Sequence, residues 1–123
     1  MDKNKYEEQI ALAESTINGG FFSNMLTFRT KRLENGLDIY YKTGNMCKDS
    51  KLWKEAGYCF SKCGEIEEEL GAEPASQYQS SAFYYSFVDT DKSSMILDKA
   101  IDFYLKQKKF ELVNNIIILR QEI

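Results

Sequence analysis

Apolar residues recur three or four positions apart through most of the chain, and polar or glycine-rich breaks divide this pattern into segments. Such spacing places the apolar side chains on one face of a helix. We expect about six helices, over residues of about 3–18, 30–46, 50–70, 74–88, 93–106 and from 109 onward. Because short links make neighbouring helices antiparallel, the pattern predicts an all-α domain built from antiparallel helix pairs.

Residues at the segment ends support these boundaries. Gly19 and Gly20 follow the first segment, and Gly71 follows the third at the position of a C-terminal cap. Ser50 is expected to cap the N-terminus of the third segment, and Pro74 suits the first turn of the fourth. Packing of the fourth segment is expected from its apolar and aromatic side chains, Tyr78, Ala82, Phe83 and Tyr85.

A short sequence in the second segment has a faint echo later in the chain. LDIYYK at 37–42 resembles IDFYLK at 101–106, with an offset of 64 residues. This offset corresponds to two helix pairs of roughly 32 residues each, which is close to the tetratricopeptide unit of about 34 residues. The small residues Gly44, Ala56 and Gly57 would let adjacent helices approach closely, as such repeats require. The echo favours a tetratricopeptide-like right-handed solenoid, a twisted sheet of helices, while an unrelated bundle with chance similarity is an equal alternative.

The last segment carries four consecutive apolar residues at 116–119. A helix that is apolar all round requires burial on more than one side. No polar capping helix follows Ile123 to close the stack. We therefore expect either a truncated solenoid or a surface that pairs with itself or with a partner.

Charge and composition exclude several function classes. The formal net charge is −3 and no dense cluster of Lys and Arg occurs, so nucleic acid is not an expected partner. Histidine is absent, which removes the usual general base near neutral pH and the commonest metal ligand. The chain shows neither a signal peptide nor an apolar run of membrane-spanning length. Three cysteines without a secretory signal fit a reducing cytoplasm.

The reactive side chains do not form a recognisable catalytic or metal site. Cys59 and Cys63 lie four residues apart on one helix face, and Cys47 is near in sequence. A zinc site needs four ligands, usually Cys or His, so we expect these cysteines to be small core residues. The acidic run at 65–69 is expected to be a solvated helix face. We expect no enzyme activity, no metal and no cofactor.

The segment 19–29 departs from helical spacing. Phe21, Phe22, Met25 and Leu26 stand among Gly, Ser, Asn and Thr. They can be core staples or an exposed apolar wedge, and the spacing alone does not decide. Full burial of one such side chain is worth about 1.5–3 kcal/mol, so partial insertion of several would give a weak, reversible membrane anchor that needs a second signal.

Lysines cluster at two of the predicted turns, where they suggest a contact with an acidic partner. One group lies between the second and third segments and the other precedes the last: Lys48, Lys51 and Lys54, then Lys106, Lys108 and Lys109. In a solenoid, we expect both turns to lie along the same edge, so that the lysines form one basic strip. Ordinary solvated lysine is the alternative for each of them.

With these features placed, the sequence resembles the alpha-SNAP family of soluble NSF attachment proteins. The similarity begins with ALAE at 11–14 and the Phe pair in GFFS at 20–23. It continues through YYKTGNMCK at 40–48, is clearest at KLWKEAG at 51–57, and resumes with KAIDFY at 99–104 and KF at 109–110. The resemblance spans nearly all of the chain, which would be somewhat under half of a full family member, its N-terminal portion.

The resemblance implies a cytoplasmic adaptor, peripheral on membranes, that acts in SNARE complex disassembly for vesicle fusion and recruits the NSF ATPase. Phe21 and Phe22 match the family's membrane-contacting pair, with Met25 and Leu26 as helpers. The family's NSF-activating C-terminal helices are absent from the 123 residues. A phospholipid surface, the SNARE complex and, for a full-length protein, NSF are therefore the implied partners.

The resemblance also assigns the SNARE-facing lysines. Lys48, Lys51 and Lys109 match basic positions that face the acidic surface of the SNARE bundle, whereas Asn115 stands where the family usually has a further lysine. A generic tetratricopeptide-like scaffold with a peptide-binding groove is the alternative function. It predicts that Phe21 and Phe22 are buried and that liposomes are ignored.

Overall fold

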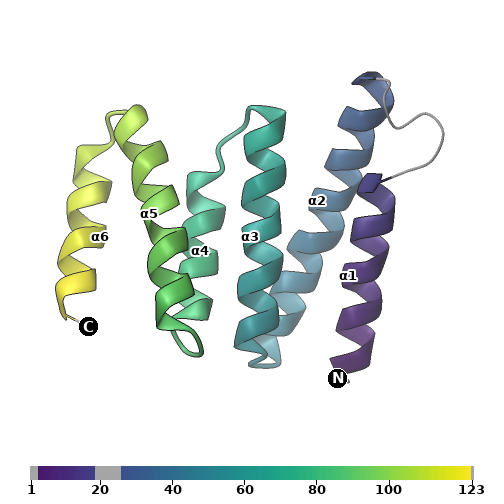
Figure 1. The fold of residues 1–123 in the computed structure, drawn as a ribbon, viewed down its shortest axis with the longest axis horizontal. Coiled ribbons are helices and arrows are strands. Elements are labelled where there is room, and N and C mark those ends of the chain that lie inside the picture. The colour runs from purple at the N-terminus through teal and green to yellow at the C-terminus, as the bar shows by residue number, and fades with distance from the viewer. Residues whose placement is uncertain (1–2, 19–25, 123) are drawn as a thin grey trace.

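A computed structural model describes residues 3–18 and 26–122, and within these ranges the chain folds into six α-helices (Figure 1). They are α1 (Lys3–Asn18), α2 (Leu26–Asp49), α3 (Trp53–Leu70), α4 (Ala75–Tyr85), α5 (Thr90–Lys106) and α6 (Phe110–Glu122). The described residues contain no strand. The prediction of an all-α domain with about six helices is confirmed.

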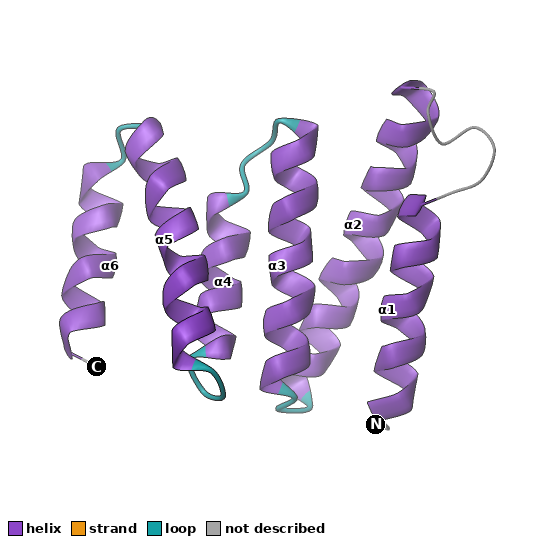
Figure 2. Cartoon of the chain, viewed as in Figure 1, coloured by secondary structure: helices purple, strands orange, loops and turns teal. Residues whose placement is uncertain are grey.

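The helices stand side by side in chain order, each antiparallel to the one before it (Figure 1). The extensive contacts are those between successive helices, and the contact between α5 and α6 is the sparsest of these. The row has two edges. The α2–α3 and α4–α5 turns lie at the lower edge of Figure 2, and the α3–α4 and α5–α6 turns lie at the upper edge. The arrangement is an open, solenoid-like stack with two faces and two edges on which to place functional residues.

Two boundaries differ from those predicted at the flanks of α2 and α3. Helix α2 begins at Leu26, so residues 26–29 are helical and the predicted loop over 19–29 is too long. Ser50 does not cap α3: Leu52 holds the N-cap position and makes no side-chain cap. The hydroxyl of Ser50 instead lies 2.8 Å from the Tyr6 hydroxyl, and its amide donates to the Met46 carbonyl at 3.1 Å as α2 ends. Ser50 therefore contacts α1 instead of capping α3, although its place in the sequence is typical of a cap.

The other termini follow local chemistry. Gly71 has φ 72° and caps α3, which confirms the predicted C-terminal cap. Pro74 holds the N-cap position of α4 rather than its first turn, and α4 ends at Tyr85 instead of near residue 88. At α5, the Asp89 carboxylate accepts a hydrogen bond from the Lys92 amide at 3.0 Å, so the helix begins slightly earlier than predicted.

The core depends on glycines where α3 meets α4. A Cβ at Gly57 would lie 2.7 Å from the Tyr85 ring, and one at Gly64 would lie 2.6 Å from the Tyr78 ring. At Gly44, a Cβ would lie 3.0 Å from the Phe60 ring. The predicted roles of Gly44 and Gly57 in close helix approach are confirmed, and Gly64 is a further such position that periodicity did not reveal.

The sequence echo is not a structural repeat. Residues 37–42 lie in α2 and residues 101–106 lie in α5. These helices run in opposite directions, whereas a repeat of helix pairs would relate α2 to α4 or α6 (Figure 1). The similarity between the two stretches is therefore coincidental, although the stack itself is built from antiparallel neighbours.

The apolar last helix is buried on one side only. Val113 and Ile116 join the core cluster of α4 and α5, while Ile117, Ile118 and Leu119 are exposed. Arg120 fixes the outer end by an ion pair with Asp98 of α5 at 3.0 Å. The predicted need of this helix for burial on a second side is not met within the described residues.

Candidate functional site

Helix α1 ends and helix α2 begins at the upper edge (Figure 1), and the candidate membrane-contact residues follow α1 in sequence as far as the first residue of α2. Phe21, Phe22 and Met25 lie outside the described residues, and Leu26 is the first residue of α2. The membrane-contact role of these four residues remains a prediction. What the structure does describe is how the two helices that carry the loop are held.

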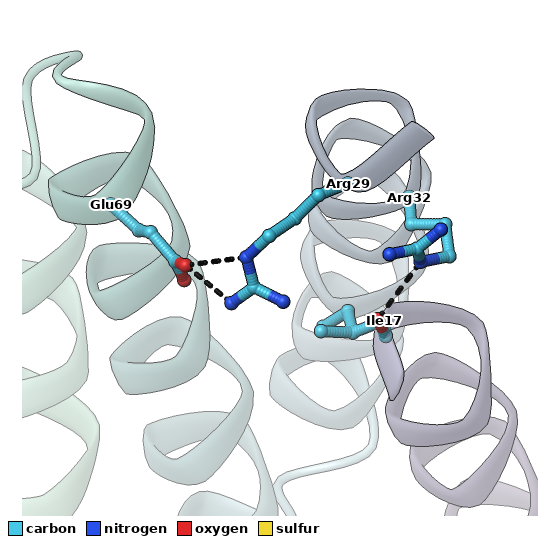
Figure 3. A network of polar contacts seen from close by, with 4 residues as sticks. All are labelled: Ile17, Arg29, Arg32 and Glu69. Carbon is cyan, nitrogen blue, oxygen red and sulfur yellow. Dashed lines mark hydrogen bonds and ion pairs between the residues drawn. The ribbon is translucent and has the colours of Figure 1, made fainter. Parts of the chain in front are cut away.

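A polar brace ties the flanks of the loop to the stack (Figure 3). The Arg32 Nε donates to the Ile17 carbonyl at 3.2 Å, which fixes the last turn of α1 against α2. The Arg29 Nε donates to Glu69 Oε1 at 2.9 Å, and its Nη2 contacts the same oxygen, so the first turns of α2 are tied to the last turn of α3. An exposed pair of this kind contributes up to about 1 kcal/mol, so it positions the helix ends more than it stabilises the fold.

Apolar packing also holds the end of α1 against α2. A Cβ at Gly36 would lie 2.7 Å from Ile17 Cδ1, so α1 and α2 touch closely just below the brace. Sequence reasoning missed Arg29 because it lies in the segment interpreted as loop. These contacts hold the end of α1 and the start of α2 firmly in place at the upper edge.

The candidate SNARE-facing lysines do not form one strip. Lys48 is half-buried near the end of α2, Lys51 is exposed in the α2–α3 turn, and Lys109 is exposed just before α6. The first turn lies at the lower edge and the second at the upper edge (Figure 2). The prediction of a single edge is wrong because three helices separate the two turns, and each helix reverses the chain. The edges are separated by about 26 Å, the length of the 17-residue α5.

The two lysine-bearing turns nevertheless share one backbone geometry. Lys51 and Lys108 adopt left-handed φ values of 59° and 60°. The Leu52 amide donates to the Cys47 carbonyl at 2.9 Å, and the Lys109 amide donates to the Tyr104 carbonyl at 2.9 Å. This is the pattern of a Schellman motif, which usually places glycine in the left-handed position.

Lys109 and Asn115 mark the weaker end of the candidate surface. The Lys109 ammonium lies 6.0 Å from the centroid of the Tyr104 ring, at the limit of a cation–π contact. Asn115 is an exposed, neutral residue on α6. Lys48 and Lys51 therefore lie close together at the α2–α3 turn, whereas Lys109 and Asn115 lie at the other end of the row of helices.

An unpredicted feature is a continuous series of aromatic rings from α2, α3, α4 and the turn after α4. We call it the aromatic ladder, and it consists of Tyr41, Phe60, Tyr84, Trp53, Phe87 and Phe83. Phe83 was expected to supply packing of the fourth segment, and its ring does pack on Tyr84 and Phe87. This packing lies at the surface, where 58% of Phe83 is exposed, and helical spacing does not distinguish it from core packing.

The cysteines and glutamates behave largely as predicted. Cys47, Cys59 and Cys63 are free and fully buried, which confirms them as core residues. Burial raises the pKa of the Cys63 thiol to about 12. The acidic run lies mostly on an exposed face, with Glu67 half-buried and its pKa raised by desolvation. Within the described residues, no three His, Cys, Asp or Glu side chains converge as a metal site.

No helix in the part of the chain that the structure describes could cross a membrane. None of these helices combines the length and the apolar character that a crossing requires.

The comparisons with known proteins that find a match agree on one family. The sequence profile of the family described as "Soluble NSF attachment protein, SNAP" matches residues 4–117. The beta-soluble NSF attachment protein of Bos taurus is 24% identical over 108 residues, which cover 86% of this chain. Those residues cover 34% of the bovine protein, so the chain spans about a third of that relative's length. No solved structure matches significantly.

Proposed function

The chain belongs to the soluble NSF attachment protein family, and from that premise we propose that it is an adaptor in SNARE complex disassembly. The adaptor binds the SNARE bundle and the membrane surface, and within a full-length protein it recruits the NSF ATPase. The observation that carries the proposal is the family profile that extends over residues 4–117, nearly the whole chain. The open row of helices supports it, because such a stack offers long surfaces rather than an enclosed catalytic cavity.

The proposed SNARE contact centres on the α2–α3 turn. Lys48 and Lys51 supply positive charge at the lower edge, and their attraction to an acidic bundle would be strongest at low ionic strength. A bundle that also reaches Lys109 has to cross the stack from one edge to the other, about 26 Å. The contact therefore runs across the helices rather than along one edge.

Charge reversal tests this contact. Lys48→Glu/Lys51→Glu is expected to weaken binding to a purified SNARE bundle at low salt, and the difference is expected to shrink at moderate salt. The matched control is Lys5→Glu/Lys31→Glu, which makes the same change in net charge at two exposed lysines of α1 and α2. Fluorescence anisotropy with a labelled bundle gives the affinities. The SNARE contact is falsified if both double variants bind as the wild type does at both salt concentrations.

The proposed membrane contact uses Phe21 and Phe22 as a weak anchor that acts together with the SNARE contact through effective concentration. Liposome flotation is expected to show binding by the wild type and loss in Phe21→Ser/Phe22→Ser. The matched control is Phe83→Ser/Phe87→Ser, which removes two exposed rings at the opposite edge and should still float. Unfolding of the Phe21→Ser/Phe22→Ser variant would favour the generic scaffold, because it would identify the two rings as core residues.

A further inference from the structure

The aromatic ladder is a preformed surface rather than a set of separate exposed side chains. Its rings follow one another at short centroid distances: 6.0 Å for Tyr41–Phe60, 5.5 Å for Phe60–Tyr84, 6.0 Å for Tyr84–Trp53 and 4.9 Å for Trp53–Phe87. Phe83 closes the end, 5.2 Å from Tyr84 and 5.3 Å from Phe87. Because each ring is held by its neighbours, a partner that binds here loses little side-chain entropy on the ladder's side.

The ladder is buried at its centre, where Phe60 is 4% exposed, and it is exposed at its two ends. Tyr41 is 48% exposed at one end, and Phe83 (58%), Phe87 (55%) and the adjoining Val88 (54%) are exposed at the other. Single exposed apolar residues are ordinary, but contiguous apolar patches mark interaction sites. Aromatic residues are also the side chains most enriched at the centres of protein interfaces.

The charged groups at the border of the ladder are mainly basic. Lys48 lies seven residues after Tyr41 on α2, which places both on one stripe of the helix. Lys51 is exposed in the turn that leads to Trp53, and the exposed Asp49 between the two lysines in sequence offsets one of their charges. Two other acidic residues are directed elsewhere: Asp89 caps α5, and Glu55 is turned about 200° around α3 from Trp53. An acidic apolar partner therefore complements this surface.

The spacing of the rings fits a helix. Consecutive centroids are 4.9–6.0 Å apart, and side chains from successive turns of an α-helix recur about every 5.4 Å. Apolar side chains at positions i, i+4 and i+7 of a partner can therefore rest on successive exposed rings. An amphipathic helix that lays its apolar face on a hydrophobic surface is a common mode of recognition.

We propose that the aromatic ladder, with Lys48 and Lys51 at its border, binds a single amphipathic helix of a partner protein that carries an apolar stripe flanked by Asp and Glu. This partner is distinct from the assembled SNARE bundle of the proposed function, because a helical bundle buries its apolar stripes between its own helices. The proposal does not depend on that function.

A membrane is the less suitable occupant of the ladder. Trp53 begins α3 at the lower edge, whereas α1 ends and α2 begins at the upper edge, where the candidate membrane loop is attached (Figure 1). The 18 residues of α3 separate these edges by about 27 Å. A bilayer that touches one edge therefore leaves the other in water.

Trp53 is the single tryptophan of the chain and reports directly on the ladder. The probes are three tryptophan-free helical peptides of about 18 residues, the number that spans the stack. The first carries a leucine stripe flanked by glutamates. The second carries the same stripe flanked by lysines, and the third keeps the glutamates but replaces the leucines with glutamine.

The full 123-residue chain is titrated with each peptide while Trp53 emission is recorded. The Leu/Glu peptide is expected to shift the emission to saturation, the Leu/Lys peptide to bind at least about tenfold more weakly, and the Gln/Glu peptide to cause no shift. Equal binding of the Leu/Glu and Leu/Lys peptides, or no shift with either, overturns the proposal.

Two variants of the ladder and its border, with one control on α6, locate the contact. Phe83→Ser/Phe87→Ser is expected to weaken the Leu/Glu peptide at least about tenfold, whereas Leu112→Ser/Leu119→Ser, an exposed apolar pair on α6, is expected to leave it unchanged. Lys48→Glu/Lys51→Glu leaves every ring in place and is expected to shift the preference toward the Leu/Lys peptide. Unchanged affinity in both ladder variants overturns the proposal.

Vesicles supply the remaining test. Phosphatidylcholine vesicles with and without phosphatidylserine are expected to leave Trp53 emission unchanged. A vesicle-induced shift that Phe83→Ser/Phe87→Ser abolishes would make the ladder a membrane surface and overturn the assignment to a protein helix.

Discussion

Gly64 sets the separation of α3 and α4, and replacing it with alanine tests how rigid that separation is. The added Cβ would lie 2.6 Å, 2.7 Å and 2.9 Å from three atoms of the Tyr78 ring. Optimal carbon–carbon separation is about 3.5–4.0 Å, so the ring or the helix has to move by about 1 Å. The perturbation is thus one methyl group pressed against one aromatic face.

The Tyr78 ring cannot move without cost. It is fully buried, its hydroxyl donates to Glu68 Oε2 at 2.7 Å, and it stacks on Phe103 at a centroid distance of 6.2 Å. Overpacking of this kind costs about 1–3 kcal/mol, while alanine in place of a helical glycine contributes about 1 kcal/mol in the opposite sense. We expect Gly64→Ala to lower the free energy of unfolding by up to about 2 kcal/mol net.

Urea unfolding followed by circular dichroism at 222 nm measures this loss, which corresponds to a fall in Tm of about 4 °C per kcal/mol. The control is a double-mutant cycle with Tyr78→Leu, which removes the ring that the methyl group meets. In that background Gly64→Ala is expected to be neutral or stabilising, so the two changes couple strongly. A stabilised Gly64→Ala single variant, or additive effects in the cycle, would refute the argument that this contact fixes the helix separation.

Three further predictions concern strain, alkaline stability and thiol reactivity. Lys108→Gly is expected to raise the free energy of unfolding by about 1 kcal/mol because φ is 60° there, whereas Lys106→Gly, within α5, is expected to lower it in the same urea assay. Burial and the 2.9 Å hydrogen bond to Glu14 raise the pKa of Tyr58 to about 12. The stability from its protonated phenol is complete below about pH 10 and is lost as the pH rises toward 12, so Tyr58→Phe is expected to lose less stability over that range in thermal melts. Three thiols are fully buried: Cys47, Cys59 and Cys63. They are therefore expected to react with an aromatic disulfide reagent at pH 8 only after unfolding. Rapid reaction in the native state would contradict their burial.

Local sequence signals predict the helices and several of their ends well. The apolar periodicity finds each helix, because burial of one face is a local pattern. Gly71 is predictable because a left-handed residue after a helix favours glycine, and its φ is 72°. The start of α2 is not predictable from local sequence, because the first turns of α2 are held by contacts of Arg29 and Arg32 with residues of other helices.

The candidate site was less accessible to sequence reasoning, for two different reasons. The exposure of Phe83 could not be predicted, because a ring that packs on Tyr84 and Phe87 at the surface has the same helical spacing as a core residue. The separation of Lys51 from Lys109 could have been predicted. The turns that carry them are three helices apart, and an odd number of antiparallel helices necessarily places two turns at opposite edges.

The placement of the lysines also ranks their contributions to a contact with an acidic bundle. Lys48 and Lys51 lie where α2 meets α3, the most extensive helix contact in the stack, so their positions are firmly fixed. Lys109 precedes α6, which has the sparsest contact with its neighbour, and Asn115 adds no charge there. Multivalent binding favours sites whose separation is fixed, because effective concentration falls when either site moves. The α2–α3 turn should therefore supply most of the electrostatic contact, and charge reversal there should weaken binding more than charge reversal at Lys109.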